Sequence, residues 1–386
     1  MSSLEGAKIL YLVSEDWYFC SHRLPIARAA RESGMDLVVL TRLNDHADAI
    51  AAEGFRAIPL RLRRGSRNPF GALSTIRDIA RTCRRERPDV VHHVNLKMCL
   101  LGSIAALWAR PRHVVNALTG LGSLFTSDRP DARLLRNLVL AALRVLDRLT
   151  GAALIVQNRD DEAMALRRHL APAERIALIP GSGVDIRRFE PRPPPPPDGV
   201  PIVTYVGRML ADKGLRELAD AARLLKRRGR EVRIILVGPT DPENPQSLSP
   251  QELQGWVAEG VLEWHGYRSD VAAVWAESTI AVLPSYREGM PKSLLEAAAS
   301  AVPAVATDVP GCRDLVVDGE TGILVAPRDA PALADAIDRL LAAPELAAAM
   351  GRAARSRAET HYADSAIAAA TLGLYARMLG TWSESA

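Results

Sequence analysis

The chain has 386 residues, 48% of them apolar, which is enough to bury the cores of two domains of about 150–200 residues each and excludes a disordered protein. Its four scattered cysteines form no CxxC pair, which excludes a disulfide framework and a cysteine zinc site and favours a reducing compartment. Residues 1–192 hold 30 Lys and Arg against 20 Asp and Glu, while residues 193–386 hold 19 against 25. We therefore expect the first half to face an anionic partner.

Short β-branched runs alternate with amphipathic stretches along the chain, which is the pattern of parallel sheets covered by helices. In the first half we predict strands at 8–14, 36–40, 55–60, 89–94, 113–118 and 153–157. In the second half we predict strands at 201–207, 232–238, 262–266, 279–284 and 302–307. The expected fold is α/β, with two Rossmann-like doubly wound domains facing across a cleft.

A proline-rich stretch separates the two series of strands, because a proline run can neither continue a helix nor donate to a sheet. We place an N-terminal acceptor-binding domain at 1–190, the linker at 191–200 and a C-terminal nucleotide-sugar domain at 201–364. The N-terminus lacks the layout of a secretion signal, and the longest uncharged apolar run, 98–109, is too short to span a bilayer. We expect a cytoplasmic protein, held peripherally at the inner face of the cytoplasmic membrane.

Polar and glycine residues follow several strands of the first half, where they can contact the acceptor or the reacting sugar. The candidates are Asp16, His22, Asn95, Lys97, Thr119 and Gly120. The segment 14–23 is predicted to be a bulky loop. His92 and His93 end a strand; one of them could face the sugar, and the alternative is that both lie in the core. The glycines after 118 follow GxGxxF and so fail the dinucleotide pattern GxGxxG.

Nine arginines lie between residues 61 and 87, against Asp78 and Glu86, and the apolar stretch 131–149 has arginines on one flank. A basic, amphipathic surface of this kind favours contact with anionic lipid. The alternative is a solvated helix face beside a core helix. Nucleic acid is not expected as a partner, because no recognised binding motif accompanies the arginines.

The first strand after the linker ends in a basic loop, with Gly207 for a sharp turn and Arg208 and Lys213 for phosphate oxygens. The alternative is a turn with two solvated basic residues. A second loop follows the strand 279–284 and contains Glu288, Gly289, Met290 and Pro291, with Glu296 in the helix beyond, where Pro291 is predicted at the first helical position. The N–H groups of Gly289 and Met290 and the helix dipole would favour phosphate or sugar oxygens, and Glu296 could accept two ribose hydroxyls. The alternative is two ordinary surface glutamates.

These two loops resemble the retaining GT-B glycosyltransferases of family GT4, which carry an Arg and a Lys after the first strand of the C-terminal domain and a Glu-x7-Glu motif. The resemblance implies that Arg208 and Lys213 hold the donor diphosphate, that Glu288 contacts the donor sugar and that Glu296 contacts the ribose. It also implies that the backbone at His265, Gly266 and Tyr267 lies against the base, and that a helix at 365–386 crosses back to the first domain. For Trp264 and Tyr267 the alternative is core packing. Many members have a Gly-Gly loop where this chain has 14–23, so the role of that segment is open.

A narrower resemblance rests on Arg64-x3-Asn68-Pro69-Phe70, on 238–245 and on 285–289. These stretches look like the subgroup that adds N-acetylgalactosamine or related sugars to undecaprenyl-diphosphate-linked acceptors. It implies a UDP-N-acetylhexosamine donor and a lipid-linked saccharide acceptor. A GDP-mannose donor, a nucleotide-sugar 2-epimerase and a non-catalytic basic scaffold remain alternatives. No Asp-x-Asp and no metal-ligand spacing occurs, so we expect no cofactor and no metal requirement.

Overall fold

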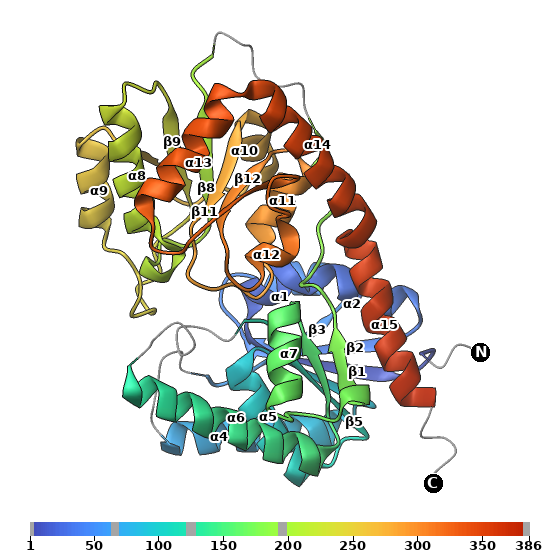
Figure 1. Ribbon diagram of the computed structural model, residues 1–386. Helices are drawn as coiled ribbons and strands as arrows, with labels where there is room; N and C mark the ends of the chain where they lie inside the picture. Colours follow the sequence, from blue (N-terminus) through green and yellow to red (C-terminus); the bar gives the residue numbers. More distant parts are fainter. Residues whose placement is uncertain (1–3, 63–68, 121–128, 192–198, 381–386) are drawn as a thin grey trace. The chain divides into compact units, whose positions relative to one another are not determined.

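The computed structural model describes residues 4–62, 69–120, 129–191 and 199–380, and its contacts divide the chain into two compact units (Figure 1). The first unit comprises Met1–Gly183 with Asp364–Ala386, and the second comprises Val184–Ala363. Three parts of the sequence predictions lie outside the described residues: Arg64 and Asn68 of the narrower resemblance, Gly122 of the GxGxxF stretch, and 192–198 of the linker. Within the described part, no helix is long and apolar enough to cross a membrane.

The first unit is a parallel sheet with the strand order β3-β2-β1-β4-β5-β6-β7. Its strands are β1 (Lys8–Glu15), β2 (Asp36–Arg42), β3 (Arg56–Pro59), β4 (Val90–Val94), β5 (His113–Leu118), β6 (Ala153–Val156) and β7 (Ile176–Leu178). Its helices are α1 (Asp16–His22), α2 (Leu24–Glu32), α3 (Ala47–Ala52), α4 (Pro69–Glu86), α5 (Leu96–Ala109), α6 (Pro130–Thr150), α7 (Arg159–Arg167) and α15 (Asp364–Gly380), with the 3₁₀ turn η2 (Ala173–Arg175).

The second unit is a parallel sheet with the order β10-β9-β8-β11-β12-β13. Its strands are β8 (Ile202–Val206), β9 (Arg233–Val237), β10 (Glu263–Trp264), β11 (Ile280–Leu283), β12 (Ala304–Thr307) and β13 (Gly322–Val325). Its helices are α8 (Leu215–Arg227), α9 (Pro250–Ala258), α10 (Val271–Glu277), α11 (Lys292–Ala299), α12 (Cys312–Leu315), α13 (Ala330–Ala342) and α14 (Pro344–His361), with the 3₁₀ turn η3 (Ala211–Lys213).

The prediction of two α/β domains with parallel sheets is confirmed, and three local predictions are corrected. Strands β7 and β13 were not predicted, because each is a short run of three or four residues that only its parallel neighbour identifies. The segment 14–23 is not a loop: residues 16–22 form α1, whose first residue, Asp16, is an acid at the positive end of the helix. Pro291 is the N-cap of α11 rather than its first helical residue.

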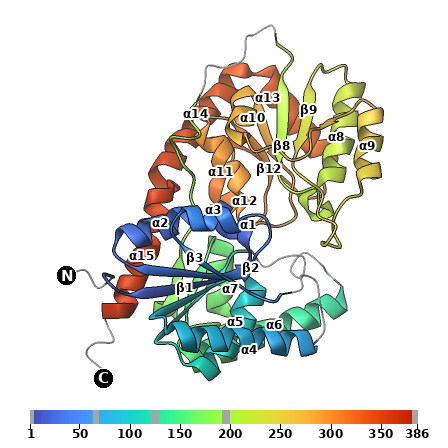
Figure 2. The same ribbon diagram turned by 180° about the vertical axis from the view of Figure 1, so that it is seen from behind.

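Alternation along each strand determines the two faces of the first sheet. Tyr11 and its alternate neighbours face α2 and α15, whereas Leu10 and Leu12 face α4 and α5. The helices α4, α5 and α6 lie side by side over this second face (Figure 2). The first sheet is therefore covered on both faces, which explains why its central strands are apolar throughout.

The chain passes between the two units at Gly183 and again at Asp364. Gly183 has φ +72°, and a Cβ there would lie 2.5 Å from the Cα of Asp364. The residues just after Gly183 pack in the second unit, where Phe189 is buried and its carbonyl accepts a hydrogen bond from Arg355 Nη1 at 2.9 Å. The boundary thus lies before the proline-rich stretch rather than within it.

Helix α15 belongs to the first unit and packs against α2 (Figure 1). Its Tyr375 hydroxyl lies 2.9 Å from the hydroxyl of Tyr11 and 2.5 Å from Nδ1 of His92, all three side chains being fully buried. Burial lowers the pKa of His92 well below its usual value and raises that of Tyr11 to about 12, so the cluster is uncharged. A polar cluster in the core therefore joins the last helix to the sheet.

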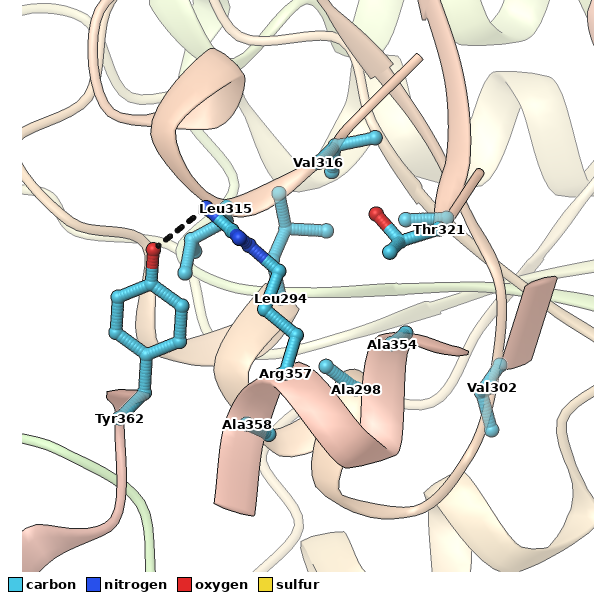
Figure 3. Close-up of a pocket in the computed structure, with 11 residues that line it drawn as sticks. Leu294, Ala298, Val302, Leu315, Val316, Thr321, Ala354, Arg357, Ala358 and Tyr362 are labelled. Carbon is cyan, nitrogen blue, oxygen red and sulfur yellow. Dashed lines mark hydrogen bonds between the residues drawn. The ribbon is translucent and has the colours of Figure 1, made fainter. Parts of the chain in front are cut away.

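A cavity of 10 Å³ lies between α11 and α14 of the second unit (Figure 3). Its walls are mostly apolar, and Arg357 Nη2 donates to Tyr362 Oη at 3.4 Å beside it. This volume admits about one water molecule. The cavity is therefore a packing defect, too small for a nucleotide sugar.

We predict that Tyr375→Phe destabilises the protein by about 1–3 kcal/mol, because Tyr11 and His92 lose a buried hydrogen-bond partner. Urea unfolding followed by circular dichroism measures the change. Tyr267→Phe is the matched control, since that side chain is 74% exposed. Equal stability of the Tyr375 variant and the wild type would show that the cluster does not stabilise the fold.

Candidate functional site

The loops predicted to bind the donor all emerge at one edge of the second sheet, because its strands are parallel and their carboxyl ends coincide. They follow β8, β10 and β11. The residues concerned are Gly207, Arg208 and Lys213; His265, Gly266 and Tyr267; and Glu288, Gly289, Met290, Pro291 and Glu296. The fold therefore assembles in one place residues that are up to 89 positions apart in the sequence.

An ion pair joins the loops after β8 and β11. Lys213 Nζ lies 2.5 Å from Glu288 Oε1, and Ser285 Oγ donates to the same oxygen at 2.6 Å. The side chain of Glu288 is only 11% exposed. Lys213 and Glu288, which the resemblance assigned to the diphosphate and to the sugar, are thus partners in an ion pair.

The second cation of the site is also paired. Arg208 Nη1 donates to Asp241 Oδ2 at 2.7 Å. Sequence reasoning missed Asp241, which lies in the proline-rich loop after β9. The available signal was topological: β9 is the neighbour of β8, so an acid just beyond β9 lies near a base just beyond β8.

Close backbone approaches hold these loops together at two glycines. A Cβ on Gly214 would lie 2.0 Å from the carbonyl oxygen of Pro284, and one on Gly238 would lie 1.8 Å from that of Gly207. Both glycines have positive φ, +70° and +142°. A residue with a Cβ would clash at either position, so the loops after β8, β9 and β11 pack in direct backbone contact.

The loop before α11 is anchored from β12. Thr307 Oγ1 donates to the carbonyl of Ser285, and the amide of Glu288 donates to the carbonyl of Pro310 at 3.2 Å. Gly289 is buried and Met290 is half-buried against the core. The Glu288 backbone is therefore fixed before any ligand binds.

Glu296, the fifth residue of α11, is 9% exposed. Burial raises the pKa of its carboxyl group, and the charge of Lys292, whose Nζ lies 3.9 Å from Oε1, opposes this rise. A buried carboxylate at this depth is an unfavourable group for stability. The alternative of an exposed helix charge is wrong for this residue.

The loop after β10 is tied to β9 through its backbone. Gly238 N–H donates to the carbonyl of Gly266 at 2.7 Å, and Trp264 Nε1 donates to the carbonyl of Gly238 at 3.0 Å. His265 Nε2 lies 3.0 Å from Glu263 Oε2. Tyr267 is 74% exposed, so core packing is excluded for it.

The first unit has polar residues at the carboxyl edge of its own sheet. Asp16 is fully buried, and its carboxylate accepts hydrogen bonds from the amides of Trp17, Asn44 and His46 at 2.7, 2.5 and 3.1 Å. These bonds lower its pKa in spite of its burial. His22 Nδ1 lies 2.6 Å from Ser21 Oγ, and its ring stacks on Tyr18.

Four further candidates follow β4 and β5. Asn95 caps α5 by accepting from the Met98 amide at 3.1 Å, with φ +75°. Lys97 is half-buried, and burial lowers its pKa. Thr119 and Gly120 are half-buried just beyond β5.

His93 and Asn116 belong to a second buried polar chain that the sequence did not reveal. His93 Nδ1 lies 2.7 Å from Asn116 Oδ1, and Asn116 Nδ2 donates to Asp147 Oδ1 at 2.6 Å. Burial lowers the pKa of His93 to about 4 and raises that of Asp147 to about 7. Both strand histidines therefore lie in the core, as the alternative reading held.

Among the residues that the structure describes, no three His, Cys, Asp or Glu side chains converge to hold a metal ion. Two basic side chains, Arg208 and Lys213, lie at the carboxyl edge of the second sheet.

Two domains, each built on a parallel sheet covered by helices, form the GT-B fold, and the comparisons identify the class of enzyme. Residues 200–343 match the family model described as "Glycosyl transferases group 1", and residues 8–152 match "Glycosyl transferase 4-like". A D-inositol 3-phosphate glycosyltransferase of Frankia alni is 30% identical over 69% of this chain and 70% of that protein. The chain belongs to the family 4 glycosyltransferases.

A second relative is also a glycosyltransferase, and solved structures have a similar fold. The N,N'-diacetylbacillosaminyl-diphospho-undecaprenol alpha-1,3-N-acetylgalactosaminyltransferase of Campylobacter jejuni is 27% identical over 92% of this chain and 95% of its own length. Among solved structures, sucrose-phosphate synthase of Thermosynechococcus elongatus has a TM-score of 0.80 at 24% identity, covering 97% of this chain and all of that one. HepE of Anabaena, in complex with UDP and glucose, has a TM-score of 0.74 at 19% identity, covering 96% and 99%. These structures share the fold.

We predict that Glu296→Gln raises the melting temperature at about pH 7.5 and has less effect near pH 4. In the unfolded chain this carboxyl group loses its proton at its usual pKa, whereas burial raises the folded-state pKa. The free energy of unfolding therefore falls as the pH rises from the unfolded to the folded pKa, and glutamine abolishes that fall. Thermal unfolding at both pH values measures the effect, with the exposed Glu320→Gln as control. Equal shifts at both pH values would contradict the prediction.

Proposed function

We propose that this enzyme transfers an N-acetylhexosamine from a UDP donor to a polyprenyl-diphosphate-linked saccharide, with retention of the anomeric configuration. The observation that carries the donor assignment is the pair of cations, Arg208 and Lys213, held with Glu288 at one carboxyl edge. The Campylobacter relative, whose name specifies an undecaprenol-diphosphate acceptor, supports the acceptor class. The setting would be bacterial surface glycan or glycoprotein assembly.

The donor would lie along the edge of the second sheet. Arg208 offers a planar fork to the diphosphate and Lys213 a point charge. Glu288 would contact the sugar, Glu296 the ribose, and the backbone at His265 and Gly266 the base. These assignments are the ones that the resemblance to family 4 implies, and the loops concerned leave the second sheet at one edge.

The reaction needs charge stabilisation more than covalent chemistry. The bond from the anomeric carbon to the phosphate oxygen breaks, and its electron pair leaves with the diphosphate, where Arg208 and Lys213 neutralise the new charge. The acceptor hydroxyl bonds the anomeric carbon from the same face, and its proton passes to an oxygen of the departing diphosphate. We assign no protein nucleophile and no metal, because the two cations supply the positive field.

The membrane contact is assigned to α6. Its residues Leu134, Leu138, Val145 and Leu149 are between 55% and 64% exposed and lie on one helical stripe. Exposed apolar side chains that lie together on one face of a helix mark an interaction surface. A helix with such a stripe beside arginines is suited to lie in a membrane interface.

Arginines border the stripe on one side. A groove of 360 Å³ beside α6 is lined by Arg144, Arg148 and Arg168, together with Leu140 and Val145. Among the described residues these three arginines have no carboxylate partner. By contrast, Arg81, Arg84 and Arg85 of α4 are bound to Asp78, the carbonyl of Trp108 and Glu86. We therefore expect anionic phospholipid to bind at α6.

We predict that Glu288→Gln lowers kcat/KM by about 100-fold or more, because a charge that stabilises the transition state is removed. The assay measures release of UDP from UDP-N-acetylgalactosamine or UDP-N-acetylglucosamine with an undecaprenyl-diphosphate-linked saccharide as acceptor. The control is Glu320→Gln, an exposed glutamate.

Further arms of this assay test the alternatives. Turnover of GDP-mannose but of neither UDP-sugar would replace the donor, and an epimer formed from donor alone would indicate an epimerase. Wild-type activity of Glu288→Gln would reject the assigned role of that residue.

We predict that joint replacement of Arg144, Arg148 and Arg168 by glutamine reduces binding to vesicles containing phosphatidylglycerol by about 10-fold or more, at about 1 kcal/mol per arginine near an anionic surface. Co-sedimentation measures it. Joint replacement of Arg81, Arg84 and Arg85 is the matched control and should have a smaller effect. A larger loss of vesicle binding in the control variant than in the α6 variant would place the membrane contact on α4.

A further inference from the structure

The loop between β9 and α9 is fastened to the loop that carries Arg208. The amide of Met209 donates to the carbonyl of Pro239 at 3.0 Å, and the amide of Leu248 donates back to the carbonyl of Met209 at 2.8 Å. A third bond runs from the amide of Ala211 to the carbonyl of Gln246, also at 2.8 Å. Both ends of the β9–α9 loop are thus bonded to the loop after β8.

Hydrogen bonds within the β9–α9 loop fix its conformation. The amide of Asp241 donates to Ser247 Oγ at 3.0 Å, and the amide of Asn244 donates to the carbonyl of Asp241 at 2.8 Å. The amide of Gln246 donates to Asn244 Oδ1 at 3.0 Å. Asp241 is only 8% exposed. The backbone of Asp241 is therefore held by the loop around it, and its largely buried carboxylate lies against Arg208.

Arg208 is held at both its backbone and its side chain. Its carbonyl accepts the buried hydroxyl of Tyr205 at 2.8 Å, and its Nη1 donates to Asp241 at 2.7 Å. The side chain is still 37% exposed. One corner of the guanidinium is therefore fixed, while part of the side chain still reaches solvent.

We propose that Asp241 positions Arg208 for the donor diphosphate, an inference that rests on the proposed function. An arginine side chain loses rotamer entropy when it is immobilised, and a carboxylate that has already ordered it removes part of that cost from binding. Asp241 touches Arg208 rather than the donor, so it is a positioning residue and not a catalytic one.

A purely electrostatic role of Asp241 predicts the opposite change in nucleotide affinity when the residue is removed. If Asp241 were only a competing anion beside the diphosphate, its removal would strengthen nucleotide binding, because repulsion between like charges would vanish. If Asp241 orders Arg208, its removal weakens binding. The sign of the change therefore separates the two roles.

The test is a double-mutant cycle on nucleotide binding, measured by calorimetric titration with UDP and with GDP. We expect Asp241→Ala to weaken binding about 5- to 30-fold, and to change it less than about 2-fold in the Arg208→Ala background. Asp241→Asn, which keeps an acceptor oxygen, should fall between Asp241→Ala and the wild type. Glu252→Ala is the matched control, because it breaks an Arg–carboxylate pair, with Arg216, on the exposed surface.

Each outcome has a defined meaning. Binding that is unchanged or tighter in Asp241→Ala overturns the positioning role and leaves the proposed function intact. Equal effects of Asp241→Ala in both backgrounds also overturn it, since they would indicate a general loss of loop structure. Absence of UDP and GDP binding to the wild-type protein overturns the proposed function together with this inference.

Discussion

The ion pair between Lys213 and Glu288 joins two loops that are 75 residues apart in the sequence, and the parallel direction of β8 and β11 makes this contact possible. In an antiparallel pair the two loops would leave the sheet at opposite edges. Gly214 brings the loops to a distance that a side chain would prevent. The charged site therefore depends on strand direction first and on the absence of one Cβ second.

Both cations of the donor edge are neutralised by carboxylates in the unliganded protein. Arg208 is paired with Asp241 and Lys213 with Glu288, so the site does not hold unpaired charge at low exposure, which would be costly. In the proposed complex, a diphosphate would share or replace these partners.

In the first unit, several polar residues form hydrogen-bonded chains within the core. His92 and His93 lie in two buried chains, one ending at Tyr375 of the last helix and the other at Asp147 of α6. Burial keeps both histidines uncharged at neutral pH, and it raises the pKa of Asp147 to about 7, so that this carboxyl group is partly protonated there. Helix α6 carries the buried carboxyl group of Asp147 on one side and the exposed apolar stripe on the other.

The sequence alone determined the two α/β domains and the charged composition of the loops after β8 and β11, because strand periodicity and loop composition are local properties. Only the tertiary structure identified Asp241 and Asp147 as members of polar clusters, because their partners are 33 and 31 residues distant and the pairing depends on strand order. Strand β13 and helix α1 were missed or misread for the same reason, as neighbours in space decide short elements. The burial of Glu296 likewise required the packed helix around it, since a glutamate in a sequence does not reveal which side of its helix faces the core.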